Sequence, residues 1–168
     1  MPAELKSKPI KESQVIMVEL VLPNDTNILN NLLGGRLMHW MDIATAMAAS
    51  RHCNNIAVTA AVDDLIFHHP IKLGNIVTLK ASVNRAFNTS MEVGVRVEVE
   101  DFQTGEKKHS NSAYFTFVSI DKTTNTKIKV PPVIPQTDEE KKWFGDALIR
   151  REQRLERHHG IVQSANTK

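Results

Sequence analysis

Alternating apolar and polar residues predict a run of antiparallel strands in the second half of the chain. Four valines alternate with polar residues or glycine between Met91 and Glu100, as in a strand with one buried and one solvated face. Residues 76–87 and 107–120 have similar patterns, and Thr104-Gly105 supplies a hairpin turn before the last strand. Residues 15–22 and 56–68 are rich in β-branched and apolar side chains, which predicts two further strands.

A long helix is predicted between the first two strands, from about Gly35 to His52. Its apolar side chains, Leu37 to Ala49, leave almost no polar face, which is typical of a buried helix. The order is therefore one strand, one buried helix and four strands. This order predicts an α+β fold in which an antiparallel sheet of about five strands wraps around a long central helix.

The chain is expected to contain one folded domain with two short flanking parts. Residues 1–13 form a flexible lead, residues 14–121 form the domain, and residues 122–168 contain a proline-rich connector and a charged helix. Thr137 and Glu140 have the spacing of a capping box, which places the start of the C-terminal helix.

Composition and charge argue against several classes of protein. The chain has 168 residues and a formal net charge of +2, which is not the basic excess of a nucleic-acid binder. No run of about 18 apolar residues exists, so we expect no membrane span. The single cysteine, Cys53, fits a cytoplasmic protein and gives no disulfide framework. No grouping of ligands predicts a metal site, because the adjacent His68 and His69 would point to opposite faces of a strand.

Asp42 is the residue that the apolar helix does not explain. A buried carboxylate without a partner costs several kcal/mol or takes up a proton. His39 and Thr45, one turn away on either side, are the only local side chains that could bond it. Asp42 is therefore either a locally satisfied structural residue or a catalytic carboxylate whose pKa is raised towards the working pH.

Gly34-Gly35 before the helix is a second candidate feature. Glycine lets a ligand approach the backbone closely, and the first amides of a helix are unpaired and carry positive dipole character. They could stabilise a developing oxyanion. An ordinary tight turn would need the same residues. The adjacent carboxylates of Asp63 and Asp64 are also candidates for catalysis, but on a strand one of them would more simply face solvent or pair locally.

Several motifs, in order, resemble the hot-dog acyl-CoA thioesterases over about residues 14–121. The resemblance is closest to the cytosolic long-chain acyl-CoA hydrolases and their bacterial single-domain relatives. The matching segments are residues 23–27, 31–35, 37–42, 48–53, 59–67, 70–74, 88–93 and 113–117. The predicted fold is thus a hot-dog fold with an added C-terminal helix.

The resemblance implies an acyl-CoA hydrolase whose site lies between two subunits. It implies that Asp42 is the catalytic carboxylate and that Asn27, about fifteen residues earlier, is its partner from the other subunit. Asn31 competes for that role. Gly35 would supply the oxyanion amide, and Asp42 would either activate water or attack the thioester. A homodimer, assembled as a trimer of dimers, is the oligomer that the family implies.

The resemblance also implies a CoA-binding segment and a short set of alternatives. Arg85, Asn88 and Ser90 lie in the segment that resembles the family's CoA contact, although Arg85 would serve equally as a solvated cation. CoA is part of the substrate, and no separate cofactor is expected. A non-catalytic acyl-CoA sensor and a hydratase or dehydratase that uses a histidine such as His39 remain the competing functions.

Overall fold

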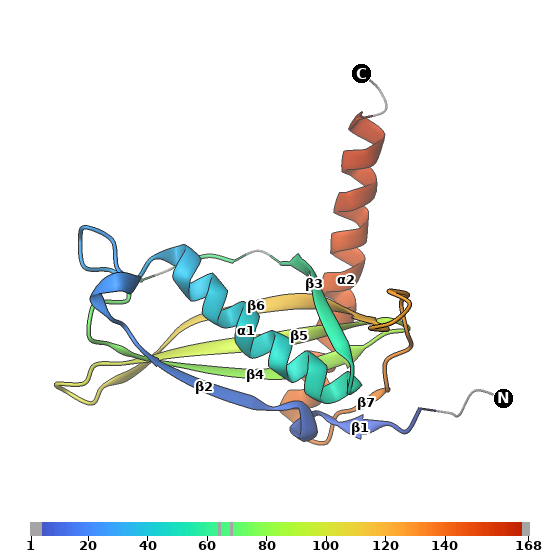
Figure 1. The fold of residues 1–168 in the computed structure, drawn as a ribbon, viewed down its shortest axis with the longest axis horizontal. Coiled ribbons are helices and arrows are strands. Elements are labelled where there is room, and N and C mark those ends of the chain that lie inside the picture. Colours follow the sequence, from blue (N-terminus) through green and yellow to red (C-terminus); the bar gives the residue numbers. More distant parts are fainter. Residues whose placement is uncertain (1–4, 64, 68, 166–168) are drawn as a thin grey trace.

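The structure, a computed structural model, describes residues 5–63, 65–67 and 69–165. One antiparallel sheet has the strand order β2-β4-β5-β6-β3. The strands are β2 (Val15–Leu20), β3 (Ile56–Val62), β4 (Ile76–Ala86), β5 (Ser90–Glu100) and β6 (Lys107–Ile120). The central helix α1 (Gly34–Cys53) crosses the concave face of this curled sheet (Figure 1). The expected hot-dog fold is thereby confirmed.

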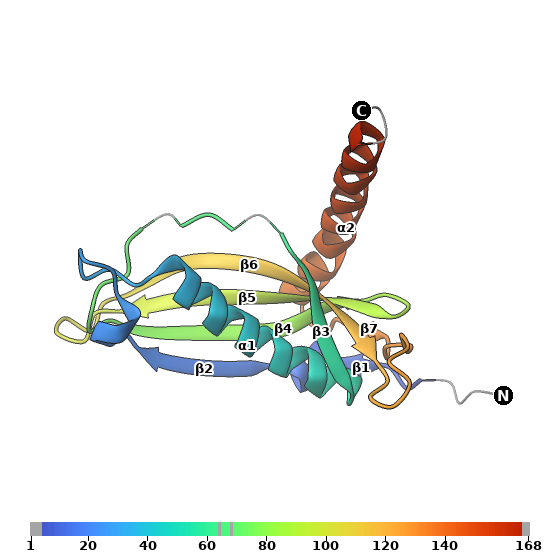
Figure 2. The same cartoon turned by 45° about the horizontal axis from the view of Figure 1, so that its top comes forward.

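The core lies between α1 and the sheet. Val93 and Val97 on β5 are fully buried and Val95 is nearly so, as the alternation predicts. They face buried side chains of α1 such as Met41 and Ala44. The opposite face of the sheet carries α2 (Asp138–Ala165), whose C-terminal half projects away from the sheet (Figure 2).

Helix α1 is buried along one side only. Met38, Ile43 and Met47 are 41%, 38% and 41% exposed, so apolar side chains remain uncovered on the part of the helix that the sheet does not reach. The expectation of burial all round is therefore wrong for the single chain, because the sheet can cover only one side of a helix. Exposed apolar side chains of this kind are what a partner surface would cover.

Two other segments differ from the sequence-based expectation. β3 ends at Val62, so the strand expected over residues 56–68 is shorter. Part of the segment expected as a flexible lead forms β1 (Lys8–Pro9) and a 3₁₀ helix η1 (Ile10–Ser13), and Ile10 is fully buried. β1 pairs in parallel with β7 (Val133–Ile134), which joins this segment to the connector before α2.

The start of α2 has the expected capping box. The Glu140 amide donates to Thr137 Oγ1 at 3.1 Å, and the Thr137 amide donates to Glu140 Oε2 at 3.2 Å. Within the part of the chain that the structure describes, neither helix is both long enough and apolar enough to cross a membrane.

Candidate active site

Asp42 lies on the half-exposed side of α1 and is bonded by a residue from the edge strand. Thr59 Oγ1 on β3 donates to Asp42 Oδ1 at 2.7 Å. Neither local candidate holds the carboxylate, because the Thr45 hydroxyl donates to the Met41 and Asp42 carbonyl oxygens instead. His39 is exposed. The local-partner interpretation of Asp42 is therefore wrong, and a partner seventeen residues away takes its place.

The position of Thr59 depends on an irregularity in β3. Thr59 pairs with Phe117 of β6, whereas Ala61 pairs with the adjacent Thr116, so Ala60 is an extra residue in the ladder. Such a β-bulge bends the strand and re-aims neighbouring side chains. The sequence contained no pattern that predicted it. The matched segment 59–67 included Thr59, but nothing distinguished its hydroxyl from that of any other threonine on a strand.

Asn27 lies in an exposed loop before α1 and does not contact Asp42. Its Oδ1 accepts from the Leu29 amide at 2.9 Å and the Asn31 amide at 3.2 Å, so the carbonyl oxygen orders the loop. The Asn27 Nδ2 group has no hydrogen-bond partner among the described residues. Asn31 is less exposed and forms an isolated bridge to Lys72. That bridge is made by the backbone, so neither side-chain amide has a hydrogen-bond partner among the described residues, and Asn27 differs in being the more exposed of the two.

The N-terminus of α1 presents unpaired amides beside an aromatic ring. Leu33 is the N-cap and provides no side-chain cap. A Cβ on Gly34 would lie 3.3 Å from carbons of the Phe67 ring, so glycine allows this close approach. Nothing lies within 4 Å of the position of a Cβ on Gly35. A Cβ at Gly35 would therefore meet open space, and the Gly34 and Gly35 amides have no hydrogen-bond acceptor among the described residues.

The expected CoA-binding residues lie at one end of the sheet, near α2. Arg85 Nη1 donates to the Phe144 carbonyl oxygen at 3.0 Å, and its guanidinium stacks over the Phe144 ring at 4.1 Å. The backbone carbonyl of Asn88 accepts from Val130, and that of Ser90 accepts from Phe87. Arg85 therefore already contacts α2. The side chains of Asn88 and Ser90 have no hydrogen-bond partner among the described residues.

The remaining histidine, cysteine and acidic candidates do not gather into a site. No group of three or more metal-ligating side chains exists among residues 5–63, 65–67 and 69–165. His68 and Asp64 lie outside the described residues. Asp63 pairs with Arg154 of α2, 91 residues away, and its side chain is only 10% exposed, so the expected solvent-facing or local pairing is wrong for Asp63.

Comparisons with known proteins identify the family of this chain. A family model described as the thioesterase superfamily matches residues 29–106. An uncharacterised acyl-CoA thioester hydrolase, YkhA of Bacillus subtilis, is 37% identical over 156 residues, which cover 93% of this chain and 90% of that protein. This chain belongs to the thioesterase superfamily. The family resemblance inferred from the motifs is thereby confirmed.

Other thioesterase relatives are much longer proteins. Mouse acyl-coenzyme A thioesterase 11 is 43% identical over 143 residues, which cover 85% of this chain but 24% of that protein. The human cytosolic acyl coenzyme A thioester hydrolase is 33% identical over 143 residues, which cover 84% of this chain and 37% of that protein. This chain thus spans about a quarter to two fifths of these mammalian thioesterases.

Solved thioesterase structures match almost the whole chain. A hexameric acyl-CoA thioesterase without ligand has a TM-score of 0.88 at 36% identity and covers 92% of this chain and 98% of its own. The acyl-CoA hydrolase of Staphylococcus aureus, with butyryl-CoA and CoA, has a TM-score of 0.88 at 33% identity and covers 96% and 98%. Variants of that hydrolase with an asparagine, an aspartate or a threonine replaced by alanine match equally well, at TM-scores of 0.91, 0.89 and 0.88.

Proposed function

We propose that this chain hydrolyses fatty acyl-CoA to a free fatty acid and CoA, with Asp42 as the catalytic carboxylate. The observation that carries the proposal is the Thr59–Asp42 hydrogen bond, which fixes a half-exposed carboxylate on the central helix of a thioesterase fold. The Staphylococcus aureus variants add support. Fifteen and seventeen residues separate the replaced asparagine, aspartate and threonine of that hydrolase, as they separate Asn27, Asp42 and Thr59.

The proposed chemistry needs only groups already described. Either Asp42 removes a proton from water while the oxygen adds to the thioester carbon, or its carboxylate adds to that carbon and water then cleaves the resulting anhydride. In both routes the carbon–sulfur bond breaks and CoA leaves as a thiolate. The Gly35 amide would stabilise the oxyanion, and Thr59 would hold Asp42 in a fixed orientation.

A complete site would need two subunits. Asn27 and Asp42 of one chain share no hydrogen bond among the described residues, and the loop that carries Asn27 ends in an apolar tip. Ile28 and Leu29 at that tip are 99% and 72% exposed, which suits burial against another protein surface. We infer that Asn27 of one subunit meets Asp42 of its partner, and that the dimers assemble as a trimer. The hexameric relative supports this assembly.

Asn88 and Ser90 are the proposed CoA contacts, together with the part of the Arg85 guanidinium that Phe144 does not occupy. Asn88 is exposed at the hairpin between β4 and β5, where its amide could donate to a phosphate oxygen. A cytoplasmic location is proposed from the relatives named as cytosolic.

Thiol release from a series of acyl-CoAs, short to long, tests the proposed activity. We expect turnover by the wild type and a loss of at least about a hundredfold in kcat for Asp42→Asn, because a positioned general base contributes about 10² to 10⁴. Asp138→Asn, whose side chain is fully exposed on α2, is the matched control and should keep full activity. CoA-ester binding without turnover in the wild type would instead indicate a sensor.

A mixing experiment tests the two-subunit site. Asn27→Ala and Asp42→Asn subunits are each expected to be inactive, but equal mixing after reversible dissociation should restore about a quarter of wild-type activity. The reason is that half of randomly formed dimers are mixed and each mixed dimer has one intact site of two. If mass spectrometry confirms mixed dimers but activity does not return, Asn27 and Asp42 act within one subunit or Asn27 does not belong to the site.

A further inference from the structure

Strand β3, which carries Thr59, lies at the edge of the sheet. Among the described residues it pairs with one neighbour only, β6. The bulge at Ala60 interrupts that pairing immediately after Thr59, and a bulge leaves its extra residue unpaired. The ladder resumes at Ala61 and Val62, so two residue pairs with β6 hold the segment beyond the bulge before β3 ends.

Asp63, the residue directly after β3, anchors that segment. Its amide donates to the Tyr114 carbonyl oxygen of β6 at 2.9 Å. Its carboxylate accepts from Arg154 Nη1 at 3.0 Å and 2.9 Å, and its side chain is only 10% exposed. Arg157 Nη2 lies 3.9 Å from the same carboxylate. The end of β3 is thus tied to α2, which is far away in sequence.

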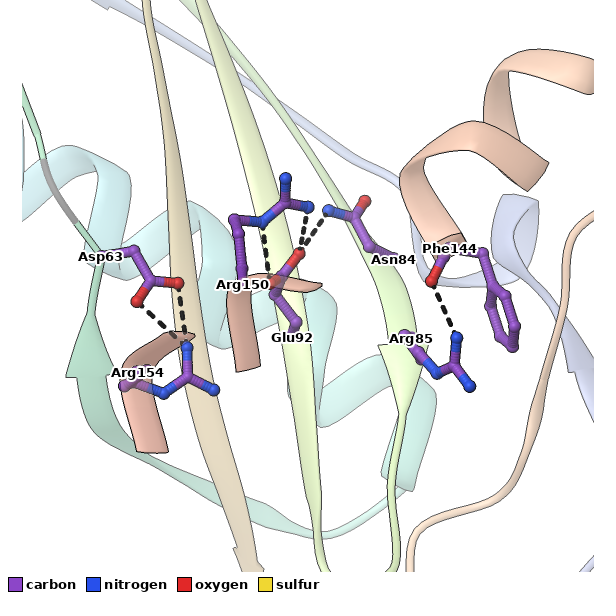
Figure 3. Close-up of polar contacts among 7 residues, drawn as sticks. All are labelled: Asp63, Asn84, Arg85, Glu92, Phe144, Arg150 and Arg154. Atoms are coloured by element: carbon purple, nitrogen blue, oxygen red, sulfur yellow. Dashed lines mark hydrogen bonds and ion pairs between the residues drawn. The ribbon is translucent and has the colours of Figure 1, made fainter. Parts of the chain in front are cut away.

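The adjacent turn of α2 is held even more firmly. Arg150 Nε and Nη2 donate to Glu92 of β5 at 3.0 Å and 2.7 Å (Figure 3). Glu92 is fully buried and also accepts from Asn84 at 3.0 Å. The Arg150 guanidinium stacks 3.6 Å over the Tyr114 ring. Because Arg150 and Arg154 are four residues apart, they share one face of α2, and a helix fixed by Arg150 presents Arg154 in one position.

We propose that the Asp63–Arg154 ion pair is a positioning contact for the reaction, which holds β3 beyond the bulge and so keeps Thr59 against Asp42. The proposal rests on the proposed catalytic role of Asp42. Arg154 touches neither Asp42 nor Thr59 and acts only through Asp63 and the backbone of β3. The C-terminal helix thereby becomes part of the catalytic apparatus without lining the site.

Arg154→Gln tests the proposal, because the Arg150–Glu92 contact still attaches α2. Lys142→Gln, an exposed position on the same helix, removes the same charge and is the matched control. We expect kcat for Arg154→Gln to fall by about tenfold with KM within about twofold, since positioning of a catalytic group acts on the chemical step. Lys142→Gln should match the wild type in both constants.

A double variant separates positioning from general destabilisation. If Arg154 acts through Thr59, Arg154→Gln added to Thr59→Val should lower kcat no further than Thr59→Val alone. A multiplicative loss would overturn the proposal. Arg154→Lys keeps the charge while losing the planar fork, so it should retain intermediate activity, and it replaces Arg154→Gln in every measurement if the latter does not fold.

Hydrogen exchange provides a readout that does not depend on activity. Amides of β3 should exchange about tenfold faster in Arg154→Gln than in Lys142→Gln, whereas those of β5 should be unchanged, because only the local opening of β3 becomes easier. Unchanged β3 exchange together with wild-type kcat would overturn the positioning role. A wild-type protein that hydrolyses no acyl-CoA would instead refute the proposed function, and the exchange data would still report on the contact.

Discussion

Thr59 Oγ1 and Asp42 Oδ1 lie 2.7 Å apart, so an edge strand and the central helix meet at the carboxylate that we assign to catalysis. Thr59→Val removes the hydroxyl and keeps the shape of the side chain. A hydrogen bond to a charged group contributes about 1.5–3 kcal/mol, so we expect kcat to fall by about 10- to 150-fold. Thr59→Ser should retain most of the activity in the same thiol-release assay. Equal activity in Thr59→Val and the wild type would show that the hydroxyl is dispensable.

Substitutions that remove the donor NH2 group of a side-chain amide, with or without its acceptor oxygen, can distinguish the roles of Asn27 and Asn31. Asn27→Asp keeps the oxygen that accepts from Leu29 and Asn31 but loses the free amide donor. We therefore expect Asn27→Asp and Asn27→Ala both to lose at least about tenfold in kcat, because each lacks that donor. Asn31→Ala should lose less than about threefold. The reverse order of the two positions in steady-state kinetics would assign the role to Asn31.

His52 should make the protein less stable in mild acid. It is buried at the end of α1, where Nε2 contacts the Pro131 carbonyl oxygen at 2.8 Å and Nδ1 has no partner among the described residues. Burial lowers the pKa of His52 below its ordinary value of 6.5, and the nearby Lys8 adds to this, against a smaller opposing effect of the Pro131 contact. The unfolded chain therefore binds more protons than the folded chain below about pH 6.5.

The stability that neutral His52 provides is thus complete above pH 6.5 and falls as the pH drops towards the lowered pKa. Urea unfolding across pH 5–8 should show this loss, with a slope of up to about 1.4 kcal/mol per pH unit from this one group. His52→Gln should flatten the slope, while the exposed His39→Gln should leave it in place. An identical slope in His52→Gln and the wild type would assign the pH dependence to other groups.

Glu92 should be among the residues most sensitive to substitution for stability. Glu92→Ala would leave Arg150, which is 19% exposed, without its carboxylate and Asn84 without its acceptor. Removal of one partner of a buried ion pair costs about 3 kcal/mol, and urea unfolding should register a loss of that size. Glu98→Ala provides a comparison, because its pairs with Lys80 and Arg96 lie on the surface, where such pairs contribute about 0–1 kcal/mol. Similar losses in the two variants would contradict this ranking.

The parts of the fold governed by local pattern could be predicted from the sequence. β6 has the expected bounds, and α1 differs from its expected range by one residue at each end, because period and turn chemistry are properties of neighbouring residues. The capping box of α2 is local in the same sense. The exposure of apolar side chains on α1 could not be anticipated, since an apolar residue has the same identity whether its own sheet or another subunit covers it.

The site was predictable only as far as single residues could be recognised. Asp42 stood out against an apolar helix, and Gly34-Gly35 stood out at its start. The Thr59 contact depends on a bulge and on the curl of the sheet, and the Asp63–Arg154 contact joins residues 91 positions apart. Neither has a signature in the spacing of residues along the chain, because both arise from tertiary geometry.

The methionines of α1 differ in exposure, so their oxidation can report whether another subunit covers the helix. Met38 and Met47 are each 41% exposed, while Met41 on the same helix is fully buried. A thioether takes up oxygen from peroxide only where solvent reaches it. If the proposed subunit interface covers Met38 and Met47, their oxidation is slow in the assembly and faster in a dissociated chain. A peptide covering residues 37–51 therefore gains oxygen mass as subunits separate, and Met41 supplies the unoxidised reference within the same fragment.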